Sequence, residues 1–520
     1  MHPAIHIIIP MAGHSRRFQA QGLKGPKALL PVGKMTMIEH VVSMFGQHDH
    51  FHFVINEEQQ KETPDIVQRL KVIAARADVS VIPSHENGPT FSALQVQGIP
   101  DDAPVTIAYC DFTVRWDYRA FLGHVSQADA GAPSFRGFHP ASLGDTYYAY
   151  MRVDGDRMVE LREKRSFTPN RMEEHASTGI YYFASSQMFR HYAERLLAEH
   201  DYAKGEAYTS LLLNMIVADG KEVIVHDVDH FICLGTPGDY RQYLYWYDYL
   251  HRPQQRHLAP PPGFRQINLV PMAGRGSRFR DYGYRVAKPL IPVRGEPMML
   301  RATASLPPAT DWIFLPRAVD LERHPIADTV RAVYPQAKFI PVAETTSGQA
   351  ATCLLAENML DPDAAVCIAS CDYEHAYDPE SWQAILNDPS IDGAIWTCRM
   401  DMSMVRNPVA FAYCVTGVDQ RTVTKVVEKR LISDNPSLDP MVVGTFWYRC
   451  ARDFIWGAKT MIEKGITVNG EHYVGTSINQ LIEAGKRFVI FDVIQWVSFG
   501  DPHEMQILGY WDNYFHKLKD

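Results

Sequence analysis

A short loop in the second half of the chain combines glycines with basic side chains. It reads Gly274-Arg275-Gly276-Ser277-Arg278, and Lys288 follows it immediately before a proline. Two glycines let backbone amides approach a polyanion closely and point their N–H groups at it. Arginine adds a planar fork of donors and lysine adds a point charge, and both suit phosphate oxygens. A turn with surface basic residues is the alternative, but the combination favours a triphosphate site.

The same pattern occurs near the start of the chain. Pro10-Met11-Ala12-Gly13, Phe18 and Lys27 match Pro271-Met272-Ala273-Gly274, Phe279 and Lys288 at a constant offset of 261 positions, which Asp111 and Asp372 share. Further pairs at an offset of 265 are Glu163-Lys164 with Glu428-Lys429, Gly179 with Gly444, Glu206 with Glu471, and Asp227 with Asp492. Regular self-similarity of this kind predicts a tandem duplication.

The elements that must position these residues alternate between strands and helices. Apolar strands are expected over 5–10 and 267–271, directly before the two loops, and over 51–55 and 312–315. Helices are expected over 37–45 and 298–305, the second shorter and less regular, and aromatic helices over 240–249 and 505–515 close the copies. A third apolar strand ends at Asp111 in one copy and at Asp372 in the other. In open α/β sheets ligands bind at the carboxyl ends of strands, where these polar residues fall.

This organisation predicts the fold class and the domain boundaries. We expect an α/β protein of two tandem Rossmann-like domains with mixed, mainly parallel sheets. The first domain would span 1–251 and the second 267–520. A proline-rich linker over 252–266 would act as a semi-rigid spacer.

Composition narrows the class of partner. The 520 residues carry a net charge of −9, which argues against a nucleic-acid partner but not against nucleotides. The eight cysteines form no CxxC pair and several lie in apolar runs, which favours reduced thiols. No apolar run has the length needed to cross a bilayer, and the start shows no basic leader. We therefore expect a cytoplasmic protein with no membrane partner, and a homo-oligomer stays open.

On these motifs the chain resembles the sugar-phosphate nucleotidyltransferase family, which has a GT-A-like α/β fold. The resemblance covers nearly all of both halves and rests on the Gly-x-Gly-Ser-Arg loop, the following Lys-Pro, the strand-end aspartate and the Glu-Lys pair. The loop and Leu234-Gly235-Thr236-Pro237 are most similar to the branch found in bacterial capsule and surface-polysaccharide clusters. The resemblance implies transfer of NMP from an NTP, with CTP mildly favoured, to a phosphorylated sugar or small phosphorylated alcohol. Diphosphate would be released, and the product would serve as a surface-polysaccharide precursor.

The resemblance also implies roles for the repeated residues. The residues expected to bind and neutralise phosphate during transfer are Arg278 and Lys288, with Arg17 and Lys27 in the first copy. The nucleotide would be bound by Ala273, Gly274, Gly276, Ser277, Gly348 and Gln349, and by Ala12, Gly13 and Gly88. The acceptor would be bound by Glu428, Lys429, Gly444 and Glu471, and by Glu163, Lys164, Gly179 and Glu206. Mg²⁺ would be held by Asp372 and Asp111, and Asp492 and Asp227 are either further ligands or solvent-facing carboxylates at strand ends.

The two copies differ at three places near the expected site. Ser15-Arg16 stands where the second copy has Gly276-Ser277, Ala28 replaces Pro289, and Pro89 replaces Gln349. Because a lost glycine restricts the backbone where phosphate must come close, we expect the second copy to be a standard nucleotidyltransferase. The first would be an altered enzyme with a different substrate or a weakened, supporting domain.

Other interpretations stay open at this point. Asp372-Tyr373-Glu374 weakly resembles the acidic motif of GT-A glycosyltransferases, which use an NDP-sugar, and a regulatory protein with one or both domains inactive is a third possibility. His48, His50 and His52 alternate as metal ligands on a strand would, but no fourth ligand is evident in the sequence. For these histidines we favour a solvated or edge-strand role.

Overall fold

The computed structural model describes residues 4–140, 148–199, 206–253, 255–401 and 404–516. The chain forms two compact units, Met1–Leu250 together with Asn513–Asp520, and His251–Asp512. The segment expected to be a spacer therefore belongs to the second unit. Within that unit, the Gln255 side chain donates a hydrogen bond to the Tyr377 carbonyl, and Phe264 stacks on Trp447.

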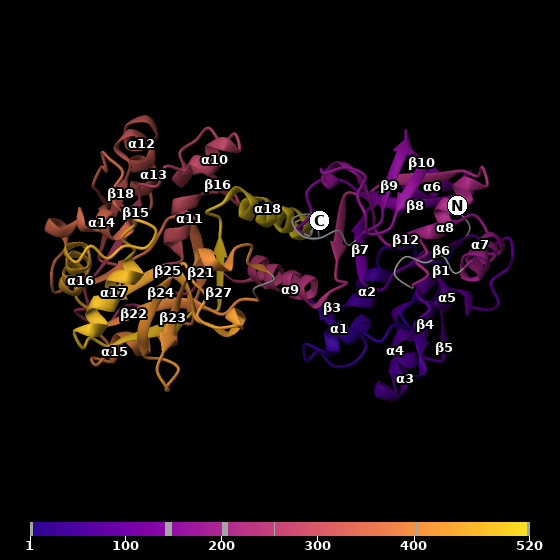
Figure 1. Ribbon diagram of the computed structural model, residues 1–520, viewed down its shortest axis with the longest axis horizontal. Coiled ribbons are helices and arrows are strands. Elements are labelled where there is room, and N and C mark those ends of the chain that lie inside the picture. Colours follow the sequence, from indigo (N-terminus) through magenta and orange to yellow (C-terminus); the bar gives the residue numbers. More distant parts are fainter. Residues whose placement is uncertain (1–3, 141–147, 200–205, 254, 402–403, 517–520) are drawn as a thin grey trace. The chain divides into compact units, whose positions relative to one another are not determined.

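The first unit is built around a large mixed sheet (Figure 1). The strands of this unit are β1 (His6–Pro10), β2 (Pro31–Val32), β3 (Met35–Thr36), β4 (His50–Asn56), β5 (Ala77–Ile82), β6 (Val105–Ala108), β7 (Phe112–Arg115), β8 (Ala130–Phe135), β9 (Tyr150–Asp154), β10 (Arg157–Arg162), β11 (His175–Ser177), β12 (Ile180–Phe183), β13 (Val223–Asp227) and β14 (His230–Cys233). The order in the sheet is β11-β9-β10-β13-β8-β12-β6-β1-β4-β5, in which β6, β1, β4 and β5 run parallel. The parallel strands place the loops after β1, β4 and β6 along one edge.

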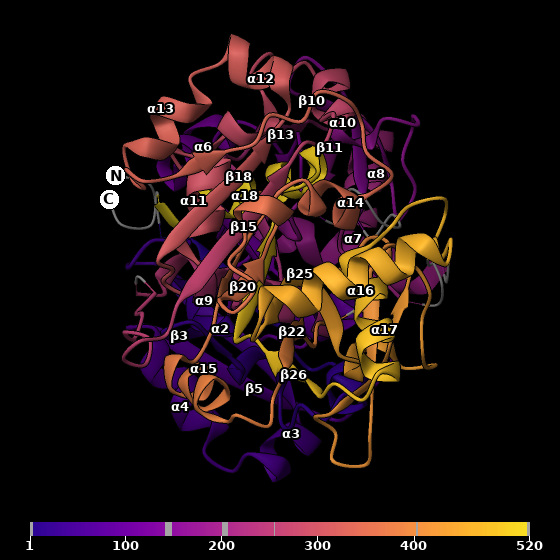
Figure 2. The same ribbon diagram turned by 90° about the vertical axis from the view of Figure 1, so that its left-hand side faces the viewer.

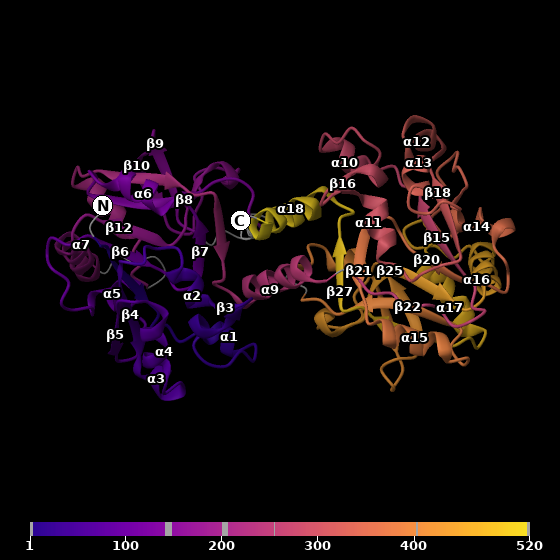
Figure 3. The ribbon, with the colours of Figure 1, turned by 180° about the vertical axis from the view of Figure 1, so that it is seen from behind.

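Helices cover both faces of this sheet. The helices of this unit are α1 (Arg16–Gln19), α2 (Met37–Val42), α3 (Glu57–Glu62), α4 (Ile66–Ile73), α5 (Pro89–Leu94), α6 (Tyr118–Val125), α7 (Ser186–Glu199), α8 (Leu211–Ala218) and α9 (Pro237–His251). The helices α5, α7 and α8 bury Ala93, Phe189 and Leu212 in one core against β6 and β12. The helices α3 and α4 lie beside β4 and β5 (Figure 3).

The second unit repeats this plan with different strand lengths. Its strands are β15 (Gln266–Met272), β16 (Pro292–Val293), β17 (Glu296–Pro297), β18 (Asp311–Pro316), β19 (Lys338–Phe339), β20 (Ala365–Ile368), β21 (Tyr373–Ala376), β22 (Gly393–Cys398), β23 (Ala412–Thr416), β24 (Val423–Glu428), β25 (Met441–Tyr448), β26 (Phe488–Asp492) and β27 (Gln495–Ser498). The main path runs β19-β18-β15-β20-β25-β22-β26, and β23 pairs with both β24 and β25. This order matches β5-β4-β1-β6-β12-β8-β13 of the first unit strand for strand.

Two layers of helices flank the second sheet as well. The helices of this unit are α10 (Ser277–Asp281), α11 (Met298–Ala304), α12 (Ala318–Arg323), α13 (Ile326–Arg331), α14 (Gln349–Leu354), α15 (Pro379–Asn387), α16 (Ala451–Glu463), α17 (Val474–Glu483) and α18 (Pro502–His516). Figure 2 shows α16 and α17 lying across one face of the sheet, where Phe454 and Ile478 enter a buried core. On the opposite face, α15 contributes Trp382 to a second core with Trp396. The predicted α/β class with mixed sheets is confirmed, and antiparallel strands extend each parallel centre.

One helix prediction was wrong. The helix α11 was expected to be shorter and less regular than its counterpart α2, yet it is one residue longer. Its regularity follows from burial, because Met298, Met299 and Ala302 all pack into the core from one side. Within the described ranges no helix is both long enough and apolar enough to cross a membrane.

A half-buried asparagine fixes a helix to a strand in both units. The Asn479 side chain of α17 accepts a hydrogen bond from the Val426 N–H (2.8 Å) and donates one to the Val426 carbonyl (2.9 Å). Asn214 of α8 makes the same pair of bonds with Leu161, both at 2.8 Å. The two amides thus set the position of the strand that ends at Glu428 or leads to Glu163.

Candidate functional site

A lysine–aspartate ion pair lies at the carboxyl edge of the first sheet. Lys27 begins a short 3-10 helix over Lys27–Leu29, and Asp111 lies in the loop after β6. The Lys27 Nζ donates to Asp111 Oδ2 at 2.5 Å, and the two side chains are only 25% and 12% exposed. Burial opposes the charged lysine, but the attraction of Asp111 outweighs it and raises the pKa of Lys27 above its usual range. A fixed positive charge therefore sits beside the strand-end carboxylate.

The second unit contains the same pair. Lys288 begins the 3-10 helix Lys288–Leu290, and its Nζ donates to Asp372 Oδ2 at 2.6 Å. Burial again opposes the charge, and Asp372 again raises the pKa of Lys288. Each sheet thus holds one lysine and one aspartate as an ion pair at the same position.

The glycine-for-serine difference in the loop leaves the backbone unchanged. Ser15 precedes α1 with φ 53° and ψ 24°, and Gly276 precedes α10 with φ 59° and ψ 28°. A left-handed conformation costs a non-glycine residue about 1 kcal/mol, so Ser15 adopts it at some expense. The Ser15 hydroxyl also accepts a hydrogen bond from the Lys27 N–H at 3.3 Å, which a glycine cannot do. The loop therefore keeps its shape in both copies.

A capping box at the start of α3 holds the loop of the first unit in place. Asn56 and Gln59 each accept a hydrogen bond from the other's backbone N–H, and both side chains are buried. The Asn56 amide donates to the Ala12 carbonyl at 2.6 Å. The Gln59 amide donates to the carbonyls of Met11 (2.8 Å) and Gly13 (3.2 Å). The Met11 N–H in turn donates to the Val54 carbonyl at 2.9 Å, so both α3 and β4 hold the loop.

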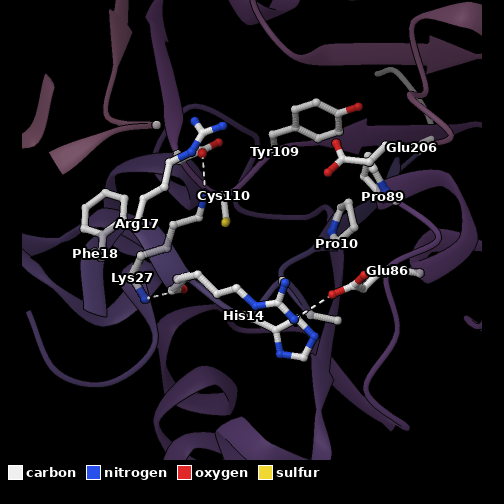
Figure 4. Close-up of a pocket in the computed structure, with 18 of the residues that line it drawn as sticks. Pro10, His14, Arg17, Phe18, Lys27, Glu86, Pro89, Tyr109, Cys110 and Glu206 are labelled. Atoms are coloured by element: carbon white, nitrogen blue, oxygen red, sulfur yellow. Dashed lines mark hydrogen bonds and ion pairs between the residues drawn. The ribbon is translucent and has the colours of Figure 1, made fainter. Parts of the chain in front are cut away.

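The loop and the ion pair open onto one cavity of about 580 Å³. Arg17 and Lys27 reach into it from one side, and Tyr109, Pro89 and Glu206 line the other (Figure 4). The predicted site residues that line this cavity are Ala12, Gly13, Arg17, Lys27, Gly88, Asp111 and Glu206. The cavity has a volume suited to a nucleotide-sized anion, and the Arg17 side chain that lines it is exposed to solvent.

Arg16, which replaces a serine of the second copy, does not add a free charge to the cavity. Its guanidinium forms an ion pair with Glu86 at 2.6 Å, and both side chains are about 70% exposed. In the second unit Arg275 donates to the Thr345 hydroxyl at 3.2 Å. In both units an arginine thus joins the glycine loop to the segment that precedes the next site helix.

The segment before α5 and α14 requires glycine in both copies. Gly88 has φ 89° and Gly348 has φ 140°, conformations that L side chains rarely adopt. A Cβ on Gly88 would lie 2.6 Å from the Ala207 nitrogen, and one on Gly348 would lie 2.5 Å from the His472 nitrogen. Pro89 is the first residue of α5, where a missing N–H is tolerated, so it leaves this geometry unchanged. At the equivalent position, Gln349 donates to the Ser370 hydroxyl at 3.3 Å.

A smaller cavity of about 240 Å³ in the second unit is lined by three of the residues expected to bind an acceptor and one expected to bind the nucleotide. Gln349, Glu428, Lys429 and Gly444 line it together with Tyr473. Burial raises the pKa of Glu428 to about 7, and the neighbouring Lys429 offsets this only in part. The Lys429 ammonium donates to the Ala410 carbonyl and lies 5.3 Å from the Tyr473 ring centre. Glu471 accepts from the Tyr473 hydroxyl and is not among the described residues that line this cavity.

The corresponding residues of the first unit are held in a similar way. The Glu163 carboxylate accepts from the Ser210 hydroxyl at 2.6 Å, and Lys164 donates to the Tyr208 hydroxyl at 2.5 Å. Lys164 and Lys429 share a left-handed backbone, with φ 54° and 55°. Gly179 has φ 75° and packs against Phe112. Of the acceptor residues predicted here, Glu206 lines the larger cavity, whereas Glu163, Lys164 and Gly179 do not.

The paired aspartates at the ends of β13 and β26 are bound to other side chains. Asp227 accepts from Ser134, from His175 and, in an ion pair at 2.5 Å, from Arg136. Asp492 accepts from Thr397 at 2.6 Å and pairs with Arg399. Burial opposes ionisation of Asp227, but His175, Ser134 and Arg136 together hold its pKa well below the usual range. The structure does not bring Asp227 into the cavity with Asp111, and Glu374 pairs with Arg301.

Sequence reasoning missed a second acid close to each strand-end aspartate. In the first turn of α9, Asp239 accepts from the Thr236 hydroxyl at 2.6 Å, and Glu504 accepts from the Ser498 hydroxyl at 2.6 Å. Burial raises the pKa of both carboxyls, and the charges of Asp111 and Asp372 respectively add to the effect. A glycine two residues after Cys233 or Ser498 marks these positions, but the acid itself lies four residues further along the chain.

Part of the first unit matches a known protein family in sequence. Residues 7–198 match the MobA-like NTP transferase domain, and this range contains the glycine loop, Lys27, Asp111 and Glu163-Lys164. The match ends before the helices α8 and α9. No curated protein matches the chain in sequence.

Several solved structures resemble about half of this chain each. A nucleoside-diphosphate-sugar pyrophosphorylase from Vibrio cholerae RC9 is 20% identical with a TM-score of 0.39, over 46% of this chain and 99% of its own. An inositol-1-phosphate CTP transferase from T. maritima is 14% identical with a TM-score of 0.36, over 47% of this chain and 97% of its own. A UDP-glucose pyrophosphorylase is 14% identical with a TM-score of 0.38, over 49% of this chain and all of its own.

Proposed function

We propose that this chain is a nucleotidyltransferase that joins NMP from an NTP to a phosphorylated sugar or small phosphorylated alcohol. The observation that carries the proposal is the Lys27–Asp111 pair beside the glycine loop, in a cavity of about 580 Å³ within a MobA-like NTP transferase domain. An acceptor phosphate oxygen would attack the α-phosphorus. The bond from that phosphorus to the β-phosphate oxygen would break, and diphosphate would leave with the electron pair.

The described residues can supply what this chemistry needs. Two anions must be held in line and their repulsion cancelled, with little covalent help from the protein. Lys27 stays protonated, and Arg17 is exposed at the cavity wall, so both can bind phosphate oxygens. The loop held by Asn56 and Gln59 offers N–H groups to the same anion.

Asp111 and Asp372 fit the needs of a Mg²⁺ ion. Magnesium prefers oxygen ligands and is often held by one or two carboxylates together with substrate phosphates and water. Each carboxylate lies at the edge of its sheet beside a lysine, where a triphosphate would supply the other oxygens. Asp227 and Asp492 fit this role less well, because arginines already bind them. When bound, the ion would neutralise charge on the phosphates.

We extend the proposal to both units, as products of a tandem duplication. The shared strand order, the two lysine–aspartate pairs and the matching loop dihedral angles support this. In the second unit Arg278 forms an ion pair with Asp501 at 2.8 Å and would exchange it for a phosphate. Glu428, Lys429 and Gly444 would receive the acceptor. CTP as the donor and a surface-polysaccharide precursor as the product are the finer parts of the proposal.

Nucleotide-binding stoichiometry tests this proposal. The full chain with Mg²⁺ would be titrated calorimetrically with CTP, UTP, GTP, ATP and dTTP, as wild type, Arg17→Ala, Arg278→Ala and the double variant. We expect two equivalents of one nucleotide in the wild type, one in each single variant and none in the double variant. Arg280→Ala, an exposed arginine of α10, is the control and should keep both equivalents.

Each other outcome has a defined meaning. Complete loss of binding and turnover in Arg278→Ala alone would place activity only in the second unit, as expected of a weakened first copy. Binding of an NDP-sugar with no binding of any NTP would instead indicate a GT-A glycosyltransferase. Absence of binding and turnover with every nucleotide and sugar phosphate would overturn the nucleotidyltransferase proposal and favour a regulatory protein.

A further inference from the structure

Three histidines gather on the first sheet, away from the cavity. His6 lies on β1, and His50 and His52 lie on the parallel neighbour β4, where His6 is paired in register with His50. Alternate residues of a strand share a face, so His50 and His52 point to the same side as His6. One ligand nitrogen from each of the three lies within 4.8 Å of the others. The adjacent strands thus form a compact group of imidazoles.

A carboxylate from the next strand joins the group. Asp78 of β5 is paired in register with His52, and its Oδ2 lies 2.8 Å from His50 Nε2 and 3.9 Å from His52 Nδ1. Its side chain is 65% exposed, whereas His52 is buried. The imidazole nitrogens therefore lie on the partly buried side of the group, and the Asp78 carboxylate lies on the side that faces solvent. An ion could enter from the solvent side.

We propose that His6, His50, His52 and Asp78 form a binding site for a transition-metal ion, Zn²⁺ by preference. Three imidazole nitrogens and one carboxylate oxygen are a ligand set that zinc accepts in tetrahedral geometry. Zn–N bonds are about 2.0–2.1 Å long, so two nitrogens on one ion lie somewhat more than ~3 Å apart. His6 Nδ1 and His52 Nε2 are 2.9 Å apart, so small side-chain rotations suffice.

The surroundings favour imidazoles ready to bind a metal. Burial lowers the pKa of His52 to about 4, and burial with the nearby His50 lowers the pKa of His6. The negative charges of Asp49 and Asp78 act in the opposite direction and tend to raise the pKa of His6. The His6 and His52 rings are thus neutral at neutral pH and keep the lone pairs that a metal needs.

This site would be separate from the proposed phosphate site. His6 begins β1, and the glycine loop follows Pro10 four residues later, about 13 Å further along the strand at 3.3 Å per residue. Mg²⁺ prefers oxygen ligands and would not compete for the imidazoles. An ion here would join β1, β4 and the edge strand β5, so its role would be to stabilise the sheet.

Cobalt spectroscopy of the metal-stripped full chain tests the proposal. Co²⁺ in a tetrahedral site gives strong visible absorption, and the titration would run in excess Mg²⁺ to fill oxygen sites. The variants are His50→Gln and Asp78→Asn, and the control is His48→Gln, an exposed histidine just outside β4. We expect one tight equivalent, displaced by Zn²⁺, in the wild type and in His48→Gln. Removing a ligand should weaken binding at least about tenfold in the other two.

A second measurement tests whether the variants fold like the wild type. Circular dichroism and the metal-free melting temperature should be alike in all four proteins, and Zn²⁺ should raise the melting temperature less in His50→Gln and Asp78→Asn than in the wild type and His48→Gln. No tetrahedral cobalt spectrum in the wild type would overturn the proposal. So would a spectrum and affinity that stay unchanged in both His50→Gln and Asp78→Asn.

Discussion

The half-buried carboxyl of Glu428 makes the stability of the second unit depend on pH. Glu428 ends β24, and a Cβ on Gly475 at the start of α17 would lie 2.5 Å from its Oε1, so the backbone packs tightly on the carboxyl. Burial raises the pKa of Glu428 to about 7 from an ordinary value of 4.5. The unfolded chain therefore loses this proton near pH 4.5 and the folded chain only near pH 7. Since the folded state binds the proton more tightly, stability falls as the pH rises through this window.

Replacing Glu428 with the neutral, isosteric glutamine should remove this penalty. The difference between the two pKa values corresponds to about 3 kcal/mol above pH 7. Water reaches the half-buried side chain and screens its charge, so we expect a gain of about 2 kcal/mol. Glu428→Gln should thus be more stable than the wild type at pH 8 by that amount and equal to it at pH 4.5.

Urea unfolding at pH 4.5, 6, 7 and 8 measures this effect. Of the nine tryptophans only Trp116 and Trp246 lie in the first unit, so tryptophan fluorescence mainly follows the second. Glu163→Gln is the matched control in the first unit, because Ser210 donates to that carboxylate and stabilises its charged form. Circular dichroism should show a smaller gain there. An unfolding free energy of Glu428→Gln that differs from the wild type by the same amount at every pH would refute the reasoning.

Two further substitutions test the site geometry. Lys27→Met should leave the largely buried Asp111 carboxylate without its cation and destabilise the first unit by about 2 kcal/mol, which is less than a fully buried pair would lose. Urea unfolding followed by circular dichroism measures this loss, and an unchanged unfolding midpoint would contradict it. Gly348→Ala should force the backbone at His472 to move and destabilise the second unit by at least about 1–3 kcal/mol. Gly274→Ala, whose Cβ meets nothing within 4 Å, is its control and should keep the wild-type melting temperature.

The sequence indicated which residues meet at the centre of each candidate site, because a local motif and a residue far along the chain repeat together in both halves. The glycine loop, the lysine after it and the strand-end aspartate recur at one offset, and parallel strands bring all three to one edge. The strands over 51–55 and 312–315 lie within β4 and β18, since their apolar residues are buried on both faces. The conformation of Ser15 was harder to predict. A serine rarely adopts φ 53°, so the substitution suggested a damaged loop that the structure does not show.

Contacts between distant segments explain what the sequence did not reveal. Asp227 resembled a metal ligand because it matches Asp492, but Arg136, 91 residues earlier, occupies it. The alternating histidines pointed to His48, which lies outside β4, whereas the parallel pairing of β1 with β4 brings in His6. No local pattern around either residue indicates its partner, since each contact follows from strand order alone.

The asparagine that binds the backbone of β24 also closes a sheet edge. The β24 strand pairs with β23 on one side, and at Val426 the other side would present a free N–H and C=O to any extended chain. Unpaired strand edges are templates for joining a second molecule and for aggregation. Asn479 satisfies both groups with one side chain, and Asn214 does the same at Leu161. In the second unit this amide, together with the helix α17 that carries it, thus opposes growth of the sheet into a neighbouring copy, whereas Leu161 lies on β10, between β9 and β13.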